Sequence, residues 1–176
     1  FAHAGAVEVI KAAFDQIGKV AMISSFGADS VVLLRLVAQV DRHAPVLFVD
    51  TEMLFDETLE YQTQVADLLG LTNVQVIKAK DAELHDPART LHKTDSNACC
   101  SLRKTAPLQG ALTSYDGWIT GRKRFHGGAR MSLPVFECGL AHVDFELTGE
   151  GWRAVPGPLA HWPDAFEQDY HAMVLS

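Results

Sequence analysis

The sequence predicts a doubly wound α/β fold, in which helices cover both faces of a mostly parallel sheet. Short apolar runs typical of buried strands alternate with segments whose apolar residues recur at helical spacing. No repeat, low-complexity stretch or linker interrupts this alternation, and 48% of the residues are hydrophobic. We therefore expect residues 1–176 to form a single domain with a substantial core.

The first half of the chain supplies two helices and two strands. Residues 6–17 place apolar side chains at helical intervals and predict an amphipathic helix. A short buried strand is expected at 19–25, and the apolar segment 29–40 predicts a helix that packs on a sheet. The run 44–50, APVLFVD, is the clearest strand in the sequence.

The second half continues the alternation. Residues 55–70 form the clearest helical pattern, with Gly70 as the expected C-terminal stop. A third strand is expected at 73–79 and a fourth at 117–121, and the helix between them is expected to begin near residues 101–102. Because such sheets bind ligands beyond the carboxyl ends of their strands, the stretches that follow the strands are the candidate site.

The composition excludes several classes of protein. A net charge of -7 and a pI near 5.5 argue against a nonspecific nucleic-acid binder, which needs a basic face. No apolar run approaches the roughly 20 residues of a membrane-spanning helix, and the first residues lack a secretory-signal pattern. Three cysteines are too few for a disulfide framework, so we expect reduced thiols and a cytoplasmic location.

The first strand is followed by SSFGADS, residues 24–30, which suits an anion. Small residues let the backbone approach a ligand, and the N–H groups of the next helix favour negative charge. Ser24, Ser25 and Ser30 add hydroxyl donors. The stretch is neither a GxGxxG fingerprint nor a Walker A sequence. A tight turn with a Ser or Asp helix cap is the alternative interpretation.

The fourth strand is followed by a basic stretch in an otherwise acidic protein. Its cationic residues could hold phosphate or sulfate oxygens, and arginine could do so bidentately. They are Arg122, Lys123, Arg124 and Arg130. The alternative is a solvated charged surface, which we disfavour because the stretch lies at the ligand edge beside glycines.

Cys99 and Cys100 are adjacent, and Arg103 and Lys104 follow them. Nearby cations favour the thiolate, which is the form that binds metals. From the pair alone, two buried small side chains or a strained vicinal disulfide remain open. Zinc is disfavoured, because its sites take four separated N or S ligands and no other His or Cys pattern presents them.

These motifs resemble, in the same order, those of the sulfonucleotide reductases. Residues 24–30 are similar to their modified PP-loop, with Ala28 where related ATP pyrophosphatases carry a lysine. Residues 46–58 resemble their Asp-Thr segment, 99–108 their tandem cysteines, and 118–137 their Trp-x-Thr-Gly segment with its later arginine. The resemblance implies an adenine nucleotide alpha-hydrolase-like fold, a Rossmann-like PP-loop architecture.

The resemblance also implies a function. It is the thioredoxin-dependent reduction of adenylyl sulfate to sulfite and AMP through an enzyme S-sulfocysteine. Cys99 and Cys100 would supply two of the four thiolates of a [4Fe-4S] cluster, with Lys104 between cluster and substrate. The substrate-binding residues implied are Ser24, Ser25, Phe26, Gly27, Ser30, Asp50, Thr51, Lys104, Lys123, Arg124 and Arg130.

The C-terminal part departs from the family pattern. The family nucleophile lies in a Glu-Cys-Gly-Leu-His tail and the other cluster ligands in a CxxC pair, and the sequence contains neither. We expect a mobile tail to be missing and residues 164–176 to be a helix cut short. Within FECGLAH, residues 136–142, Cys138 is a weak candidate nucleophile, and a buried strand cysteine is the better interpretation.

Three other functions remain open. Phosphoadenylyl sulfate could be the substrate, with the basic residues of 121–130 serving its 3'-phosphate. An ATP pyrophosphatase of the same fold is disfavoured by the absent loop lysine. A non-catalytic nucleotide-binding paralogue would account for the absent tail motif and CxxC pair. A homo-oligomer is compatible with the sequence.

Overall fold

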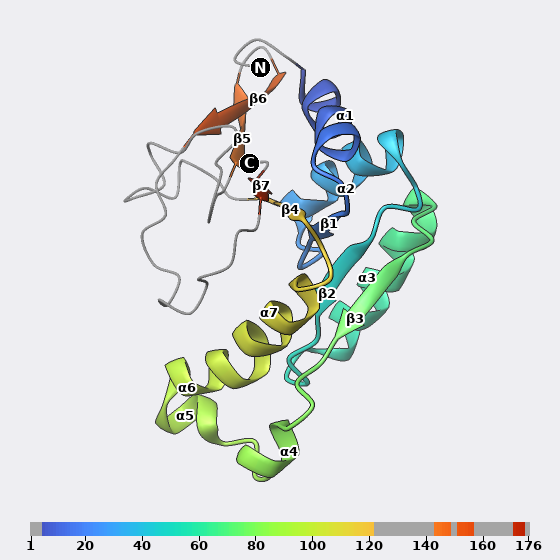
Figure 1. Cartoon of the computed structure of the whole chain (residues 1–176). Helices are drawn as coiled ribbons and strands as arrows, with labels where there is room; N and C mark the ends of the chain where they lie inside the picture. Colours follow the sequence, from blue (N-terminus) through green and yellow to red (C-terminus); the bar gives the residue numbers. More distant parts are fainter. Residues whose placement is uncertain (1–4, 122–142, 149–150, 157–170, 175–176) are drawn as a thin grey trace.

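Five parallel strands form the main sheet of the protein, in the order β3-β2-β1-β4-β7 (Figure 1). The computed structural model describes residues 5–121, 143–148, 151–156 and 171–174. The strands of the sheet are β1 (Val20–Ile23), β2 (Val46–Val49), β3 (Val74–Ile77), β4 (Gly117–Thr120) and β7 (His171–Val174). Two more strands, β5 (Val143–Thr148) and β6 (Gly151–Pro156), pair antiparallel with each other.

Helices cover both faces of this sheet, which confirms the predicted fold class (Figure 1). The long helices are α1 (Ala6–Gln16), α2 (Ala28–Val40) and α3 (Asp56–Leu69) on one face, with the shorter α7 (Ala106–Leu112) on the other. The remaining helical segments are α4 (Ala82–His85), α5 (Leu91–Thr94), α6 (Ser96–Cys100) and the π-helical turn η1 (Ser101–Thr105). Gly70 ends α3 with a φ of 67°, a left-handed conformation that glycine adopts without strain.

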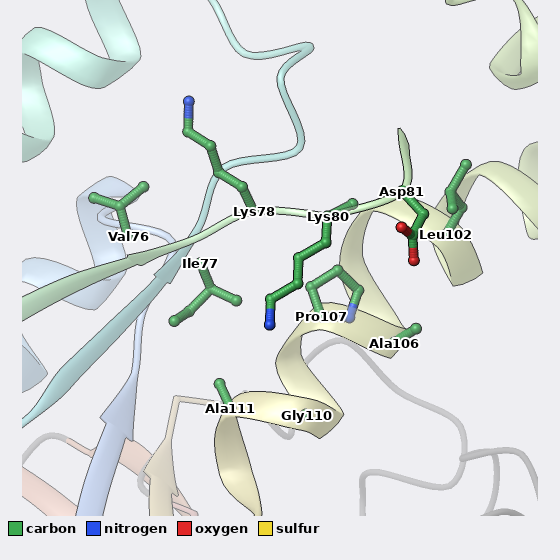
Figure 2. Close-up of a pocket in the computed structure, with 11 residues that line it drawn as sticks. Val76, Ile77, Lys78, Lys80, Asp81, Leu102, Ala106, Pro107, Gly110 and Ala111 are labelled. Carbon is green, nitrogen blue, oxygen red and sulfur yellow. The ribbon is translucent and has the colours of Figure 1, made fainter. Parts of the chain in front are cut away.

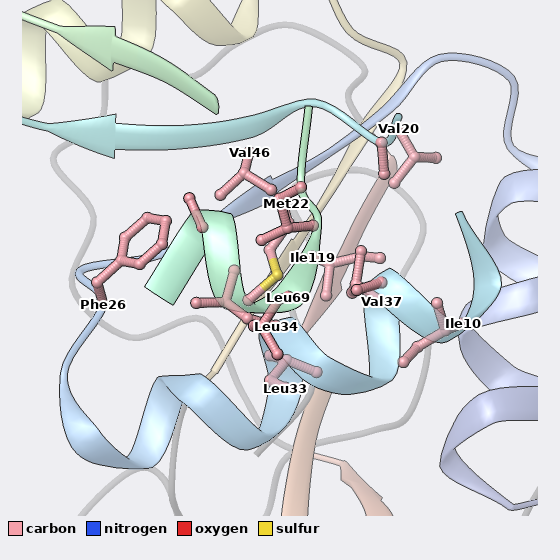
Figure 3. Packing of buried hydrophobic residues seen from close by; sticks show 14 of the residues in the cluster. Ile10, Val20, Met22, Phe26, Leu33, Leu34, Val37, Val46, Leu69 and Ile119 are labelled. Atoms are coloured by element: carbon pink, nitrogen blue, oxygen red, sulfur yellow. The ribbon is translucent and has the colours of Figure 1, made fainter. Parts of the chain in front are cut away.

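Each face of the sheet has its own apolar core, because successive side chains of a strand point to opposite faces. Figure 3 shows the larger core, where Met22 of β1 and Ile119 of β4 lie with Leu34 and Val37 of α2. The smaller core lies between the sheet and α7, and its buried members are Ala21, Leu47, Leu108, Leu112 and Trp118. The predicted strand positions and the first three predicted helices are confirmed.

The helix that carries the cysteine pair begins earlier than predicted. A start near residues 101–102 is wrong, because α6 already begins after Asp95, whose carboxylate accepts the N–H of Ala98 at 2.9 Å. The helical run then continues through η1 into α7. Pro107 explains the wider turn, since it has no N–H for the carbonyl of Arg103 and its ring would clash there in a regular α-helix.

The end of the chain also differs from its prediction. Residues 164–176 were expected to be a helix, but His171–Val174 form β7, which pairs in parallel with β4. The open edge of β4 offers backbone hydrogen bonds that a short apolar segment can use, whereas so short a helix is unstable by itself. Within the described ranges, no helix is both long and apolar enough to span a bilayer.

Leu34→Ala should lower the free energy of unfolding by about 2–5 kcal/mol, because the Leu34 side chain is 0% exposed in the larger core. Leu68→Ala is the matched control, since Leu68 of α3 is 81% exposed, and its effect should stay within about 0.5 kcal/mol. Urea unfolding followed by circular dichroism measures both values. Equal losses in the two variants would contradict this assignment of the core.

Candidate functional site

The strand order creates a topological switch point at β1. The chain runs outward from β1 through β2 to β3 and then returns to β4 on the other side of β1. The connection that leaves the carboxyl end of β1 runs toward β2 and therefore away from β4, which favours a crevice at the carboxyl ends of β1 and β4. Open α/β sheets bind their ligands at such a crevice.

A cavity of about 460 Å³ lies at this edge of the sheet. It is lined by the carboxyl ends of β1, β2 and β4, by α2, by the start of α3 and by the run from η1 to α7. It brings together five predicted substrate-binding residues from three segments of the chain, Ser24, Ser25, Ser30, Thr51 and Lys104. The apolar part of its lining is Ile23, Phe48, Val49, Leu54, Leu108 and Trp118.

A second cavity, of about 610 Å³, lies between the end of β3 and α7 (Figure 2). In this view the Lys80 side chain extends toward Pro107 and Ala111, while Lys78 points the other way. This cavity is larger, but it contains none of the predicted site residues. We therefore assign the candidate site to the cavity at the switch point.

The loop after β1 is fixed by its own side chains. The Ser24 hydroxyl accepts the N–H of Phe26 at 3.0 Å, which holds Phe26 at a positive φ of 56°. The Phe26 ring is buried and packs edge-on against Phe48 with centroids 5.6 Å apart. Gly27 is the N-cap of α2, and it makes no side-chain cap hydrogen bond. No Ser or Asp therefore occupies the N-cap position itself, and the assignment of this loop to anion binding stays a prediction.

Asp50 is buried, and its carboxylate holds the loop after β2 through two interactions. One of its carboxylate oxygens accepts the N–H of Glu52 at 2.8 Å, and the other lies 3.0 Å from the Lys78 ammonium. The hydrogen bond and the charge of Asp50 raise the pKa of Lys78. Asp50 is buried and is not part of the cavity lining, whereas Thr51 is. Of this predicted pair, the structure places the threonine at the cavity.

The two cysteines lie on α6 in different environments. Cys99 is buried, Cys100 is exposed, and both thiols are free. Lys104 lies one helical turn further on and lines the cavity. Across the described ranges, no three His, Cys, Asp or Glu side chains are grouped closely enough to hold a metal ion. The described residues alone therefore form no complete metal site, and the assignment of Cys99 and Cys100 as metal ligands stays a prediction.

Arg103 is the functional candidate that the sequence did not identify beyond its charge. Its side chain is 2% exposed, which makes it one of the largest fully buried side chains among the described residues. Its guanidinium binds the carboxylate of Asp86 at 3.1 Å and that of Glu52 at 3.4 Å. No local pattern predicts this pairing, because the partners lie 17 and 51 positions away.

Asp86 is the principal buried partner of Arg103. Besides the guanidinium, its carboxylate accepts the N–H groups of Thr90 at 2.8 Å and Leu91 at 3.1 Å. Burial by itself raises the pKa of this carboxyl, but the hydrogen bonds from Arg103, Leu91 and Thr90 and the guanidinium charge outweigh it. The net pKa of Asp86 is therefore lowered, and its charged form is the stable one in the fold.

Several predicted residues lie outside the described part of the chain. They are Arg122, Lys123, Arg124, Arg130 and Cys138. Their assignment to anion binding, and that of Cys138 to a weak nucleophile, stay predictions. Phe26 and Gly27 are described, and they shape the loop rather than line the cavity.

A parallel, doubly wound sheet with a lysine, serines and the N-terminus of α2 around the cavity at its switch point defines a doubly wound α/β protein with a polar ligand site. Within that class, the chain belongs to the phosphoadenosine phosphosulfate reductase domain family, whose model matches residues 19–170. The resemblance seen in the motifs is thereby confirmed.

Named relatives agree with this membership. The chain is 40% identical over 174 residues to the adenosine 5'-phosphosulfate reductase of Mesorhizobium japonicum, with 97% of this chain and 64% of that protein covered. It is 41% identical over 175 residues to that of a Chelativorans species, with 97% and 67% covered. The chain thus spans about two thirds of the length of these relatives.

A solved structure has the same fold. The phosphoadenylyl-sulfate reductase of Candida auris, in a phosphate complex, superimposes with a TM-score of 0.64 at 22% identity. The match covers 77% of this chain and 66% of that one. At this identity the likeness supports the fold and nothing more.

Asp86→Asn should flatten the acid limb of the stability curve. Because the fold lowers the pKa of Asp86 below its ordinary 3.8, the folded state binds fewer protons than the unfolded state. The resulting stability is present above that ordinary pKa and is lost as the pH falls through the folded pKa. Between about pH 5 and pH 2, the unfolding free energy of the wild type should therefore fall more steeply than that of Asp86→Asn.

Denaturant unfolding at a series of pH values measures this slope. Asp67→Asn, on the exposed side of α3, is the matched control and should keep the slope of the wild type. An Asp86→Asn curve parallel to that of the wild type would contradict the ion pair with Arg103.

Proposed function

We propose that this chain binds adenylyl sulfate, and that the protein containing it reduces this substrate to sulfite and AMP in sulfate assimilation, with thioredoxin as the electron donor. The observation that carries the proposal is the cavity at the switch point, which collects five residues expected to contact a sulfonucleotide. Family membership and the names of the relatives support the same substrate class.

The cavity suits both halves of such a ligand. The N-terminus of α2 carries backbone N–H groups and the positive end of a helix dipole, and Ser25 and Ser30 add hydroxyl donors. Lys104 supplies a positive charge for phosphate and sulfate oxygens. The apolar lining, which includes Phe48 and Trp118, suits the nucleoside.

The proposed reaction has two balanced steps. A cysteine thiolate attacks the sulfur of adenylyl sulfate, the bond from that sulfur to the phosphate oxygen breaks, and AMP leaves with the electron pair. The product on the enzyme is an S-sulfocysteine. One thioredoxin thiolate then attacks the cysteine sulfur, and sulfite leaves with the electron pair of the broken S–S bond. The second thioredoxin thiol resolves the mixed disulfide, which returns the enzyme thiol and leaves thioredoxin as a disulfide. Within this chain, the role of the described residues is to bind the nucleotide and orient its sulfur.

We also propose that Cys99 and Cys100 are ligands of a [4Fe-4S] cluster. They are free and adjacent, and Lys104 follows them by about one helical turn, which suits cluster ligands. They would supply two of the four thiolates, and the other two would come from elsewhere in the full protein. When bound, such a cluster supplies a redox-active group whose potential responds to nearby charge. Reduced thiols also favour a cytoplasmic protein.

The unphosphorylated substrate is the better supported of the two sulfonucleotides. The relatives at 40% and 41% identity are both named adenosine 5'-phosphosulfate reductases. The cavity as described contains one cationic side chain, that of Lys104. A 3'-phosphate would draw on Lys123, Arg124 and Arg130, which lie outside the described residues.

Lys104→Ala should weaken the binding of adenylyl sulfate to this chain by about tenfold or more, because a charge-assisted hydrogen bond is worth about 1.5–3 kcal/mol. Calorimetric titration measures the affinity. Lys11→Ala is the matched control, since Lys11 is an exposed lysine of α1, and it should bind as the wild type does. Binding that is equally tight in all three proteins would remove Lys104 from the site.

The full natural protein should release sulfite from adenylyl sulfate when reduced thioredoxin is present. Phosphoadenylyl sulfate as the better substrate would overturn the preference stated above. No sulfite from either compound, together with tight binding of both, would favour a non-catalytic nucleotide-binding protein.

Cys99→Ser and Cys100→Ser test the metal centre. Full natural protein purified without oxygen should contain about four iron and four acid-labile sulfide per chain, and each variant should lose most of both, because a thiolate is removed. Iron and sulfide analysis and the visible absorption spectrum measure the content. Cys138→Ser is the control at the third cysteine, which is not proposed as a cluster ligand, and it should keep the iron and sulfide content of the wild type. Metal-free wild-type protein would contradict the cluster.

A further inference from the structure

Arg103 places a positive charge inside the protein, where an unpaired ion would be very costly. It lies in η1, three positions after Cys100 and next to Lys104. Its side chain is 2% exposed. Its charge is met by two carboxylates, while Nε has no hydrogen-bond partner among the described residues, so the partners of the two Nη atoms show what Arg103 holds together.

The guanidinium joins two loops to the helix. Nη1 donates to the carbonyl of Thr51 at 3.2 Å and to the carboxylate of Glu52 at 3.4 Å. Nη2 donates to the carboxylate of Asp86 at 3.1 Å and lies 3.5 Å from its carbonyl. Thr51 and Glu52 follow β2, and Asp86 follows β3 by way of α4. Arg103 thus connects η1 to the ends of two neighbouring strands.

The loop after β2 needs such a support. Glu52 has a positive φ of 60°, a conformation that costs free energy for a residue other than glycine. Three side chains hold this turn, since Asp50 accepts the N–H of Glu52, Arg89 donates to its carbonyl at 3.4 Å, and Arg103 binds its carboxylate. Arg103 also donates a hydrogen bond to the carbonyl of Thr51, and Thr51 lines the cavity.

We propose that Arg103 is a positioning residue for the ligand cavity. Its guanidinium fixes the loop after β2, so that Thr51 forms one wall of the cavity. Arg103 itself lies in η1, which also carries Lys104. The proposal rests on the proposed function for the identity of the ligand. Arginine is required because its planar fork reaches three acceptor residues at once, whereas the ammonium of lysine is a point charge with a different geometry.

Arg103→Met should weaken the binding of adenylyl sulfate by about tenfold or more, through displacement of the wall rather than loss of a ligand contact. The matched control, Arg35→Met on the exposed side of α2, should bind as the wild type does. Arg103→Lys keeps the charge and should recover only part of the affinity. If Arg103→Met does not fold, Arg103→Lys carries the same comparison.

A double-variant cycle separates positioning from general destabilisation. Thr51→Ala should weaken binding in the wild type but have little further effect in Arg103→Met, since the wall is already displaced. Ser25→Ala, in the loop after β1, should have the same effect in both backgrounds, because the hydrogen bonds that Arg103 makes among the described residues go to other loops. Full additivity of Thr51→Ala with Arg103→Met would overturn the proposal.

Amide hydrogen exchange tests the same point without any ligand. In Arg103→Met, exchange should accelerate at residues 50–54 and 86–91, while α1 and β1 keep their protection. Uniform acceleration across all elements would mean a merely structural role. Wild-type protein that binds no adenylyl sulfate would overturn the proposed function alone, because the exchange pattern would still decide the role of Arg103.

Discussion

The structure depends on the place of β1 between two parallel neighbours. β1 pairs with β2 through Met22 and Ile23, and with β4 along its whole length. This pairing brings the carboxyl ends of three strands to one edge, and the alternation of side chains gives each face a core. The cavity follows from the same arrangement, because the connection from β1 to β2 turns away from β4 and leaves space at the carboxyl ends of these strands.

The protein is acidic, whereas the ligand proposed for the cavity is an anion, so the positive charge that attracts this ligand must be local. The net charge of the chain is -7. Three carboxylates of this region are paired, Asp50 with Lys78 and both Glu52 and Asp86 with Arg103. The described lining of the cavity contains Lys104 and no carboxylate, and the N-terminus of α2 adds the positive end of a helix dipole. A locally positive site is therefore compatible with a negative protein.

Local patterns predicted the strands and the loop after β1, because periodicity and small residues act over a few positions. The serines of that loop, Thr51 and Lys104 were predicted on their motifs and lie together at the cavity. The buried network of Arg103 was beyond such reasoning, since its partners are distant in sequence. The early start of α6 depends on one N-cap hydrogen bond, from the N–H of Ala98 to the carboxylate of Asp95. The formation of β7 depends on its pairing with the edge of β4.

One proline relates the cysteine pair to the cavity. Pro107 favours the π-helical turn before it, in which Ala106 donates to the carbonyl of Ser101 five positions back. Side chains four positions apart lie on nearby faces of a helical run, so Lys104 follows the exposed Cys100 by about one turn. Because Lys104 lines the cavity, this short run connects the cysteine pair to the wall of the cavity.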